Sequence, residues 1–150
     1  MKKNILFNKS FITKYEKSNI NKVFENKKFT DGEFQKKCEK FIENKIKSSC
    51  IALTQSCSSA LEIAMLLINL KSNDEVIMPS YTFTSTANAV LLRGAKPIFI
   101  DVNPHDVNLN YELVEKKITK KTKAIIVVHY GGVACDMDKY LKLKKNIKFI

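Results

Sequence analysis

The sequence predicts an α/β fold: a mostly parallel sheet with flanking helices. From about residue 50 onward, short apolar runs alternate with helix-length stretches, as in a series of β–α–β units. Some of these runs are apolar throughout, such as Ala124–Val128, which is typical of strands buried on both faces of a parallel sheet. The length of 150 residues is that of one ordinary domain.

The first 48 residues are expected to form a helical N-terminal segment, and residues 49–150 the sheet-containing portion. Apolar residues recur at spacings of three and four at Phe34, Cys38, Phe41, Ile42 and Ile46. This pattern predicts a helix that begins just after Gly32. The stretch from Ile12 to Phe24 is a weaker helix candidate.

The alternation of patterns then predicts each later element in turn. Strands are expected at about residues 50–54, 74–78, 96–100 and 123–128, with a further strand opening at Ile147. The helices expected between them cover 60–70, 82–92, 111–118 and 136–143, with Gly94 as a helix stop and Asp136 as a helix cap. Because the last residues open a core strand, we expect the fold to be incomplete at its C-terminus.

The charge is strongly basic, with a net charge of +11, and raises the question of nucleic acid. Lysine supplies 25 of the 26 basic residues, and Arg93 is the other. A surface that reads bases usually uses arginine, whose planar fork matches base edges and phosphates. We therefore expect no nucleic-acid partner and interpret the lysines as solvated helix faces. A basic nucleic-acid-binding module is the alternative.

Membrane and metal partners are also not expected. No apolar stretch approaches the roughly 20 residues that span a bilayer, and the apolar run at the N-terminus is too short for a signal peptide. A cytoplasmic protein is therefore expected. The cysteines form no Cys-x-x-Cys pair, so no metal site is expected and the thiols should be reduced; they are Cys38, Cys50, Cys57 and Cys135.

The segment 54–62, after the first expected strand, is rich in small hydroxyl residues at a helix start. Free backbone N–H groups, hydroxyl donors and the helix dipole would together favour an anion such as phosphate there. The other interpretation is plain capping of the helix by Ser56 or Ser58. With only four glycines, neither Gly-x-Gly-x-x-Gly nor a P-loop motif is present, which disfavours the Rossmann and P-loop classes.

The next strand is followed by two aromatic residues, Tyr81 and Phe83. An aromatic ring at the carboxyl end of a parallel sheet is placed to stack on a planar cofactor ring, because ligands collect at that edge. The alternative is that either ring is ordinary core.

Taken together, the two loops give the sequence a family resemblance. Residues 53–62 followed by 74–83 resemble the DegT/DnrJ/EryC1/StrS aminotransferases. Further similarity to that family lies at 92–101, 122–125 and 128–132, and at the opening segments 7–9 and 30–32. The resemblance covers essentially the whole chain, with several motifs in the family's order.

This resemblance implies the large domain of a fold-type-I transferase that uses pyridoxal phosphate (PLP). It implies a homodimer that transfers an amino group from glutamate, the amino-acid donor, to a 4-keto-6-deoxy sugar nucleotide for surface polysaccharide. By position, Cys57 and Ser58 match the family's phosphate-binding pair, with Cys57 in place of a small glycine or alanine, and Phe83 matches the ring that stacks on the pyridine. His129 and Asp101 also match family positions, and we expect structural roles for both.

The resemblance further implies that the catalytic groups are absent from these residues. PLP chemistry needs a lysine amine for a Schiff base and a carboxylate on the pyridine nitrogen. The family's carboxylate and lysine are both expected beyond Ile150. We therefore expect this chain alone to be inactive, and a non-catalytic truncated fragment is the alternative to an enzyme.

Overall fold

The computed structural model describes residues 6, 9–48, 50–143 and 146–150. It contains two compact units, Met1–Leu53 and Thr54–Ile150. The opening residues Phe7 and Asn8, and Ser49, at which the sheet-containing portion was expected to begin, lie outside the described residues.

The first unit consists of two helices, α1 (Lys14–Asn26) and α2 (Glu33–Ile46). A reciprocal capping box begins α1, in which the Glu16 carboxylate accepts from the Thr13 N–H at 2.7 Å. Gly32 occupies the N-cap of α2, so the helix predicted to begin just after it is confirmed.

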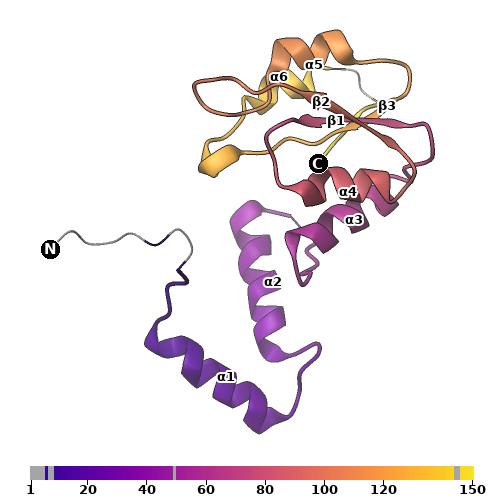
Figure 1. Ribbon diagram of the computed structural model, residues 1–150. Coiled ribbons are helices and arrows are strands. Elements are labelled where there is room, and N and C mark those ends of the chain that lie inside the picture. The colour runs from indigo at the N-terminus through magenta and orange to yellow at the C-terminus, as the bar shows by residue number, and fades with distance from the viewer. Residues whose placement is uncertain (1–5, 7–8, 49, 144–145) are drawn as a thin grey trace, which may run out of the picture. The chain divides into compact units, whose positions relative to one another are not determined.

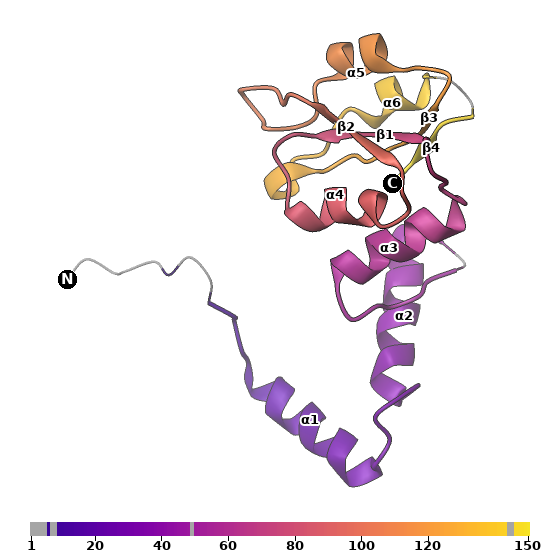
Figure 2. The same ribbon diagram turned by 45° about the vertical axis from the view of Figure 1, so that its right-hand side comes forward.

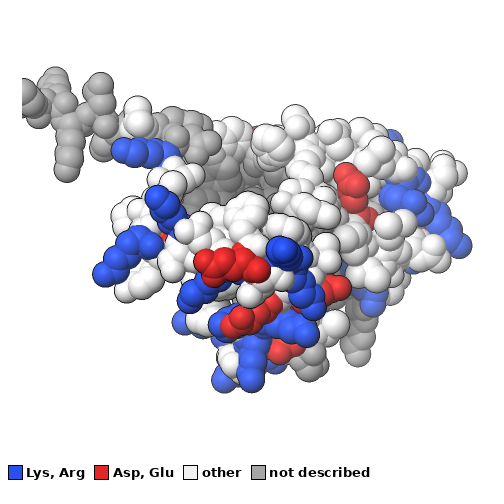
Figure 3. All heavy atoms as spheres, turned by 90° about the horizontal axis from the view of Figure 1, so that it is seen from below, with Lys and Arg blue, Asp and Glu red and all other residues white. Residues whose placement is uncertain are grey.

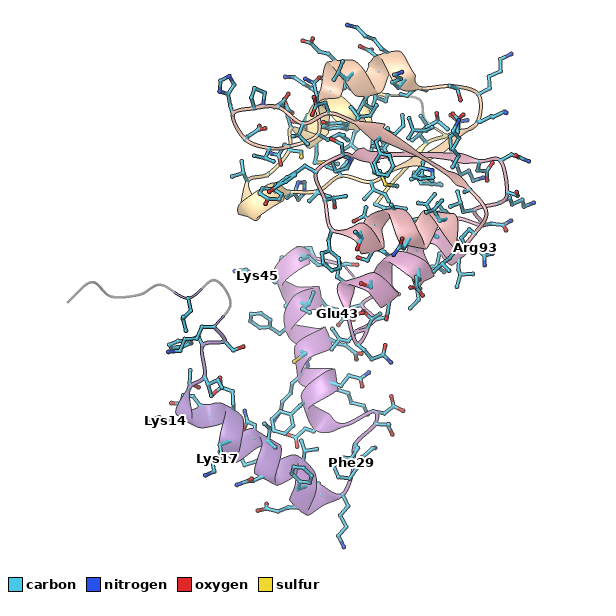
Figure 4. All side chains as sticks on the ribbon, viewed as in Figure 1. Lys14, Lys17, Phe29, Glu43, Lys45 and Arg93 are labelled. Carbon is cyan, nitrogen blue, oxygen red and sulfur yellow. The ribbon has the colours of Figure 1, made fainter. Side chains whose placement is uncertain are left out.

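The two helices of this unit bury none of their residues. Phe29, from the connection that follows α1 (Figure 4), packs edge-on against Phe24 with ring centroids 5.7 Å apart. Lys14 and Lys17 project from α1 in the same view. On the face that Figure 3 shows, acidic side chains lie among the lysines, so no patch of a single sign forms there.

The second unit is built on a four-stranded sheet of order β2-β1-β3-β4, in which every neighbouring pair is parallel. The strands are β1 (Glu75–Pro79), β2 (Lys96–Ile100), β3 (Thr122–Ile125) and β4 (Lys148–Phe149). Ile77 of β1 pairs with Ile98 on one side and Ile125 on the other. The predicted parallel α/β fold is confirmed.

Helices cover both faces of this sheet (Figures 1 and 2). One face carries α3 (Cys57–Leu67) and α4 (Thr84–Leu91), and the other carries α5 (Tyr111–Lys117) and α6 (Met137–Leu141). The alternation of side chains along β1 separates two cores, because Val76 and Met78 pack with α3 and α4 whereas Ile77 packs toward α5 and α6.

The prediction of a strand at residues 50–54 is wrong. Residues 50–54 are irregular, and Leu53 is 41% exposed. The hydrogen bonds of Cys50 here are local ones with Ser48. A short apolar run becomes a strand only when a neighbouring strand completes its backbone hydrogen bonds, and periodicity cannot show whether one is present.

Other element bounds differ by a few residues from those predicted. α3 begins at Cys57 rather than near residue 60, and it ends before Leu70, which is still buried. Asp136 sits at the N-cap of α6 but makes no side-chain cap hydrogen bond; its carboxylate instead pairs with Lys139 at 3.3 Å. None of the described helices is long and apolar enough to cross a membrane.

Candidate functional site

At the start of α3, one of the two serines that were candidates for the helix cap takes that role. Ser56 is the N-cap, and its Oγ accepts from the Ser59 N–H at 3.1 Å. The Thr54 hydroxyl donates to the Ser56 carbonyl at 2.8 Å and fixes the turn before the helix. Ser58 lies inside the first turn, so capping does not occupy its hydroxyl. Within the described part of the chain, the N–H groups of Cys57 and Ser58 donate to no protein acceptor.

A cavity of about 900 Å³ opens where the strands reach their carboxyl ends. α3, the segment after β1 and the start of α4 form one part of its wall, and the residues after β3 and β4 form the rest. The lining residues are Cys57, Ser58, Leu61, Tyr81, Thr82, Phe83, Ser85, Thr86, Ile126, Val127, Val128, Tyr130 and Ile150.

The peptide groups beyond β3 continue the sheet at this edge. The Ile126 N–H donates to the Ile77 carbonyl and the Val127 N–H to the Ile150 carbonyl, both at 2.8 Å. Figures 1 and 2 both show the C-terminal end of the described chain beside α4, and Ile150 packs on the core that α4 helps to form. The floor of the cavity is therefore made of apolar side chains, Ile126, Val127, Val128 and Ile150, on backbone held by the sheet.

The three residues singled out in the sequence, Cys57, Ser58 and Phe83, line this one cavity although two come from the start of α3 and the third from the segment between β1 and α4. Phe83 is 76% exposed and Tyr81 is 55% exposed, so neither ring is ordinary core. Thr82 and Thr86 share a hydrogen bond of 2.9 Å between their hydroxyls and brace the turn that carries Phe83. The cavity thus combines a helix N-terminus with an exposed aromatic ring.

Tyr130 is a lining residue to which sequence reasoning gave no role. It lies on a short 3₁₀ turn, Tyr130–Gly132, in which Gly131 and Gly132 take φ values of 59° and 84°. Its ring lies 5.2 Å from that of Tyr81, tilted by 49°. The neighbouring Tyr81 hydroxyl raises the pKa of Tyr130 above its ordinary value. The one signal in the sequence was the motif 128–132, whose family likeness says nothing of geometry.

His129 and Asp101, for which structural roles are expected, each accept a hydrogen bond from a nearby backbone N–H. His129 Nδ1 accepts from the Cys135 N–H at 3.1 Å, and Asp101 Oδ1 accepts from the Val102 N–H at 2.8 Å. Burial raises the pKa of the Cys135 thiol, which donates to the Val128 carbonyl at 3.5 Å.

The chemistry of the cavity follows from what lines it. Its described walls carry hydroxyls, a thiol, aromatic rings and aliphatic groups but no lysine, histidine or acidic side chain. Across the described residues, no three metal-ligating side chains come together. The arrangement is suited to holding an anion at α3 beside a planar ring, and it offers no strong base for proton transfer.

Comparison with protein families and curated proteins gives consistent matches. Residues 10–150 match the model of the DegT/DnrJ/EryC1/StrS aminotransferase family. An uncharacterised protein of Methanocaldococcus jannaschii is 38% identical over 130 residues, covering 85% of this chain and 34% of that protein. The 3-oxo-glucose-6-phosphate:glutamate aminotransferase of Bacillus subtilis is 33% identical over 129 residues, covering 86% of this chain and 29% of that enzyme. The chain thus spans about a third of these relatives.

Solved structures have the same fold over most of this chain. NtdA from Bacillus subtilis, with bound pyridoxamine phosphate (PMP), superposes with a TM-score of 0.78 at 35% identity, covering 85% of this chain and 30% of that one. The PMP form of a candidate sugar aminotransferase of Streptococcus pneumoniae superposes with a TM-score of 0.88 at 28% identity, covering 94% and 36%. By these matches, the chain belongs to the DegT/DnrJ/EryC1/StrS aminotransferase family.

Proposed function

We propose that the cavity of the second unit binds PLP, with the phosphate at the start of α3 and the ring against Phe83. The observation that carries this proposal is that Cys57 and Ser58, at the start of α3, line one cavity with Phe83, from the segment between β1 and α4. The N–H groups of Cys57 and Ser58 and the Ser58 hydroxyl are three donors within one helical turn. A volume of about 900 Å³ suits a ligand of cofactor size.

The residues of this chain would bind and orient the cofactor. The donors at α3 would fix its phosphate end, and the exposed ring of Phe83 would set the plane in which a flat ligand lies. The apolar floor at Ile126–Val128 would keep water from the buried side of that ligand. When bound, PLP supplies the electron sink that transamination requires.

The larger activity that we propose is transfer of an amino group from glutamate to a 4-keto-6-deoxy sugar nucleotide, such as dTDP-4-keto-6-deoxyglucose. The names of relatives support it, since they include a glutamate aminotransferase acting on a keto sugar phosphate and an aminotransferase of UDP-4-amino-4-deoxy-L-arabinose. A relative named for spore coat polysaccharide biosynthesis supports a role in surface polysaccharide.

Within this activity, we propose dTDP-4-amino-4,6-dideoxygalactose as the product. The proposal rests on the similarity of the Ser-Cys-Ser at 56–58 and of residues 129–138 to the enzymes that make this amino sugar. A homodimer in the cytoplasm is part of the same proposal, and it too rests on likeness to the family.

We also propose that this chain by itself does not transaminate. The described walls of the cavity contain no lysine side chain that could bond to PLP and no acidic side chain that could pair with a pyridine nitrogen. The role of this chain would be to bind the phosphate and the ring of PLP. The lysine and the acidic residue that the chemistry needs would come from residues beyond Ile150.

Binding of PMP to the 150-residue chain tests the cofactor site. PMP has no aldehyde, so it cannot label the chain's exposed lysines as PLP would. We expect calorimetry to show one site for PMP and at least tenfold weaker binding of pyridoxamine, which lacks the phosphate. Equal affinity for the two ligands, or no PMP binding by the folded chain, would refute the proposed site.

A further inference from the structure

We infer that Asn108 is a positioning residue, whose carboxamide holds the turn at Tyr130 so that this ring forms a wall of the cavity. Asn108 is 2% exposed and is not itself a lining residue. Its Oδ1 accepts from the Tyr130 N–H at 3.0 Å, and its Nδ2 donates to the Val133 carbonyl at 3.1 Å. The two partners fix which end of the amide is oxygen, since one donates and the other accepts.

The turn that Asn108 holds belongs to a loop, residues 129–135, that is closed by hydrogen bonds between its own residues. The Cys135 N–H bonds to His129 Nδ1, and the Gly132 N–H bonds to the His129 carbonyl at 3.1 Å, so these contacts tie the loop to itself. The bonds of Asn108 come instead from 22 and 25 residues away along the chain. They anchor both the start and the far side of the loop to a different part of the unit.

The support behind Asn108 is itself well defined. In the segment between β2 and α5, the Asn103 N–H donates to the Asn108 carbonyl at 2.8 Å. The Asn108 N–H donates to Asp106 Oδ1 at 2.9 Å. The next residue, Leu109, is buried in the core and receives the Tyr140 hydroxyl on its carbonyl. Asn108 therefore projects from a braced segment, which is what an anchor for a glycine-containing loop requires.

The consequence for the cavity lies in Tyr130. The ring is 38% exposed, lines the cavity and contacts Tyr81 at 5.2 Å between centroids. No other described side chain outside the loop bonds to the loop's backbone. Without the Asn108 amide, the two glycines would leave the turn free to move its tyrosine away from Tyr81.

The test follows the Tyr81–Tyr130 contact and PMP affinity separately in the 150-residue chain, and its affinity arm rests on the proposed cofactor site. We expect Asn108→Ala to lose the nuclear Overhauser contact between the two rings and to bind PMP about three- to tenfold more weakly. The control is Thr122→Val, which removes another buried side-chain acceptor, bonded to the Thr119 N–H at 2.9 Å, from the opposite end of β3. It should keep the ring contact and the affinity.

A double-mutant cycle then shows whether Asn108 acts through Tyr130. In a Tyr130→Ala background, Asn108→Ala should change PMP affinity by less than about twofold. An equal loss in both backgrounds, or an unchanged ring contact in folded Asn108→Ala, would overturn the inference. If the natural chain binds no PMP, the cofactor proposal fails while the ring contact still decides the positioning role.

Amide hydrogen exchange tests the anchoring role of Asn108 in the natural chain, without any variant. The Tyr130 amide, which donates to Asn108, should exchange at least tenfold more slowly than the Gly131 amide, for which no acceptor is present among the described residues. Equal exchange of the two amides would contradict the inference even if Asn108→Ala failed to fold.

Discussion

At the scale of single residues, we expect the three residues of the proposed site to contribute unequally to cofactor binding. Ser58 offers a hydroxyl and an N–H, Cys57 offers chiefly its N–H, and Phe83 offers a ring face. A hydrogen bond to a charged group is worth roughly 1.5–3 kcal/mol, so Ser58→Ala should weaken PMP binding about ten- to a hundredfold. Phe83→Leu should cost on the order of 1 kcal/mol through lost stacking, and Cys57→Ala should cost little.

Titration of PMP into the three variants measures this ranking. Ser85→Ala is the matched control, because Ser85 lines the same cavity from α4 rather than from the start of α3. The proposed phosphate site at the start of α3 would be wrong if Cys57→Ala abolished PMP binding while Ser58→Ala left it intact.

The same residues show how far sequence reasoning reached at this scale. Small hydroxyl residues before an apolar helix indicated an anion site, because helix N-termini carry unpaired N–H groups. Which serine caps the helix could not be decided, since Ser56 and Ser58 differ only in backbone conformation. Tyr130 was missed because its place in the cavity depends on a loop held by Asn108, a contact 22 residues away in the chain.

At the scale of elements, α6 is tied to the segment before α5 by one buried phenol. Tyr140 is 2% exposed, its hydroxyl donates to the Leu109 carbonyl, and its ring meets that of Tyr111 edge-on at 5.4 Å. We expect Tyr140→Phe to lower the free energy of unfolding by about 1–2 kcal/mol, because the ring stays and the buried carbonyl loses its donor. Urea unfolding at pH 7 measures the change.

The same phenol predicts a dependence on pH. Burial raises the pKa of Tyr140 well above its ordinary value of about 10. A raised pKa in the folded state stabilises the fold fully below about pH 10, and this contribution is lost as the pH rises further. The difference in unfolding free energy between the natural chain and Tyr140→Phe should therefore shrink above pH 10. A difference that grows there would contradict this account of Tyr140.

Element by element, the sequence predicted what local patterning controls. The parallel strands near 74–78, 96–100 and 123–128 follow from apolar runs between helical stretches, and they form. The strand at 50–54 does not form, because a strand depends on a partner that no local pattern reveals. The observed bounds of α3 differ from the predicted ones for a related reason, because the cap at Ser56 and the turn after Leu67 depend on backbone geometry.

At the scale of the whole molecule, the central expectation is a binding scaffold without the reacting groups. We expect the 150-residue chain to produce no amino sugar from PLP, glutamate and dTDP-4-keto-6-deoxyglucose. Borohydride reduction with PLP should give only scattered, substoichiometric labelling of exposed lysines. Turnover with a single stoichiometric lysine adduct would overturn this prediction, and a longer chain that carries the family's lysine is the positive control.

The most direct test of the account is to map where PMP binds, using the backbone amide resonances of the chain in nuclear magnetic resonance. We predict that the largest shifts on adding PMP fall on Cys57, Ser58 and the amides beside Phe83, and that inorganic phosphate moves the first two alone. These shifts should survive moderate salt, because the donors belong to one preformed helix turn. Shifts confined to the lysine-rich helices α1 and α2, and abolished by salt, would contradict the account and favour a non-specific basic surface.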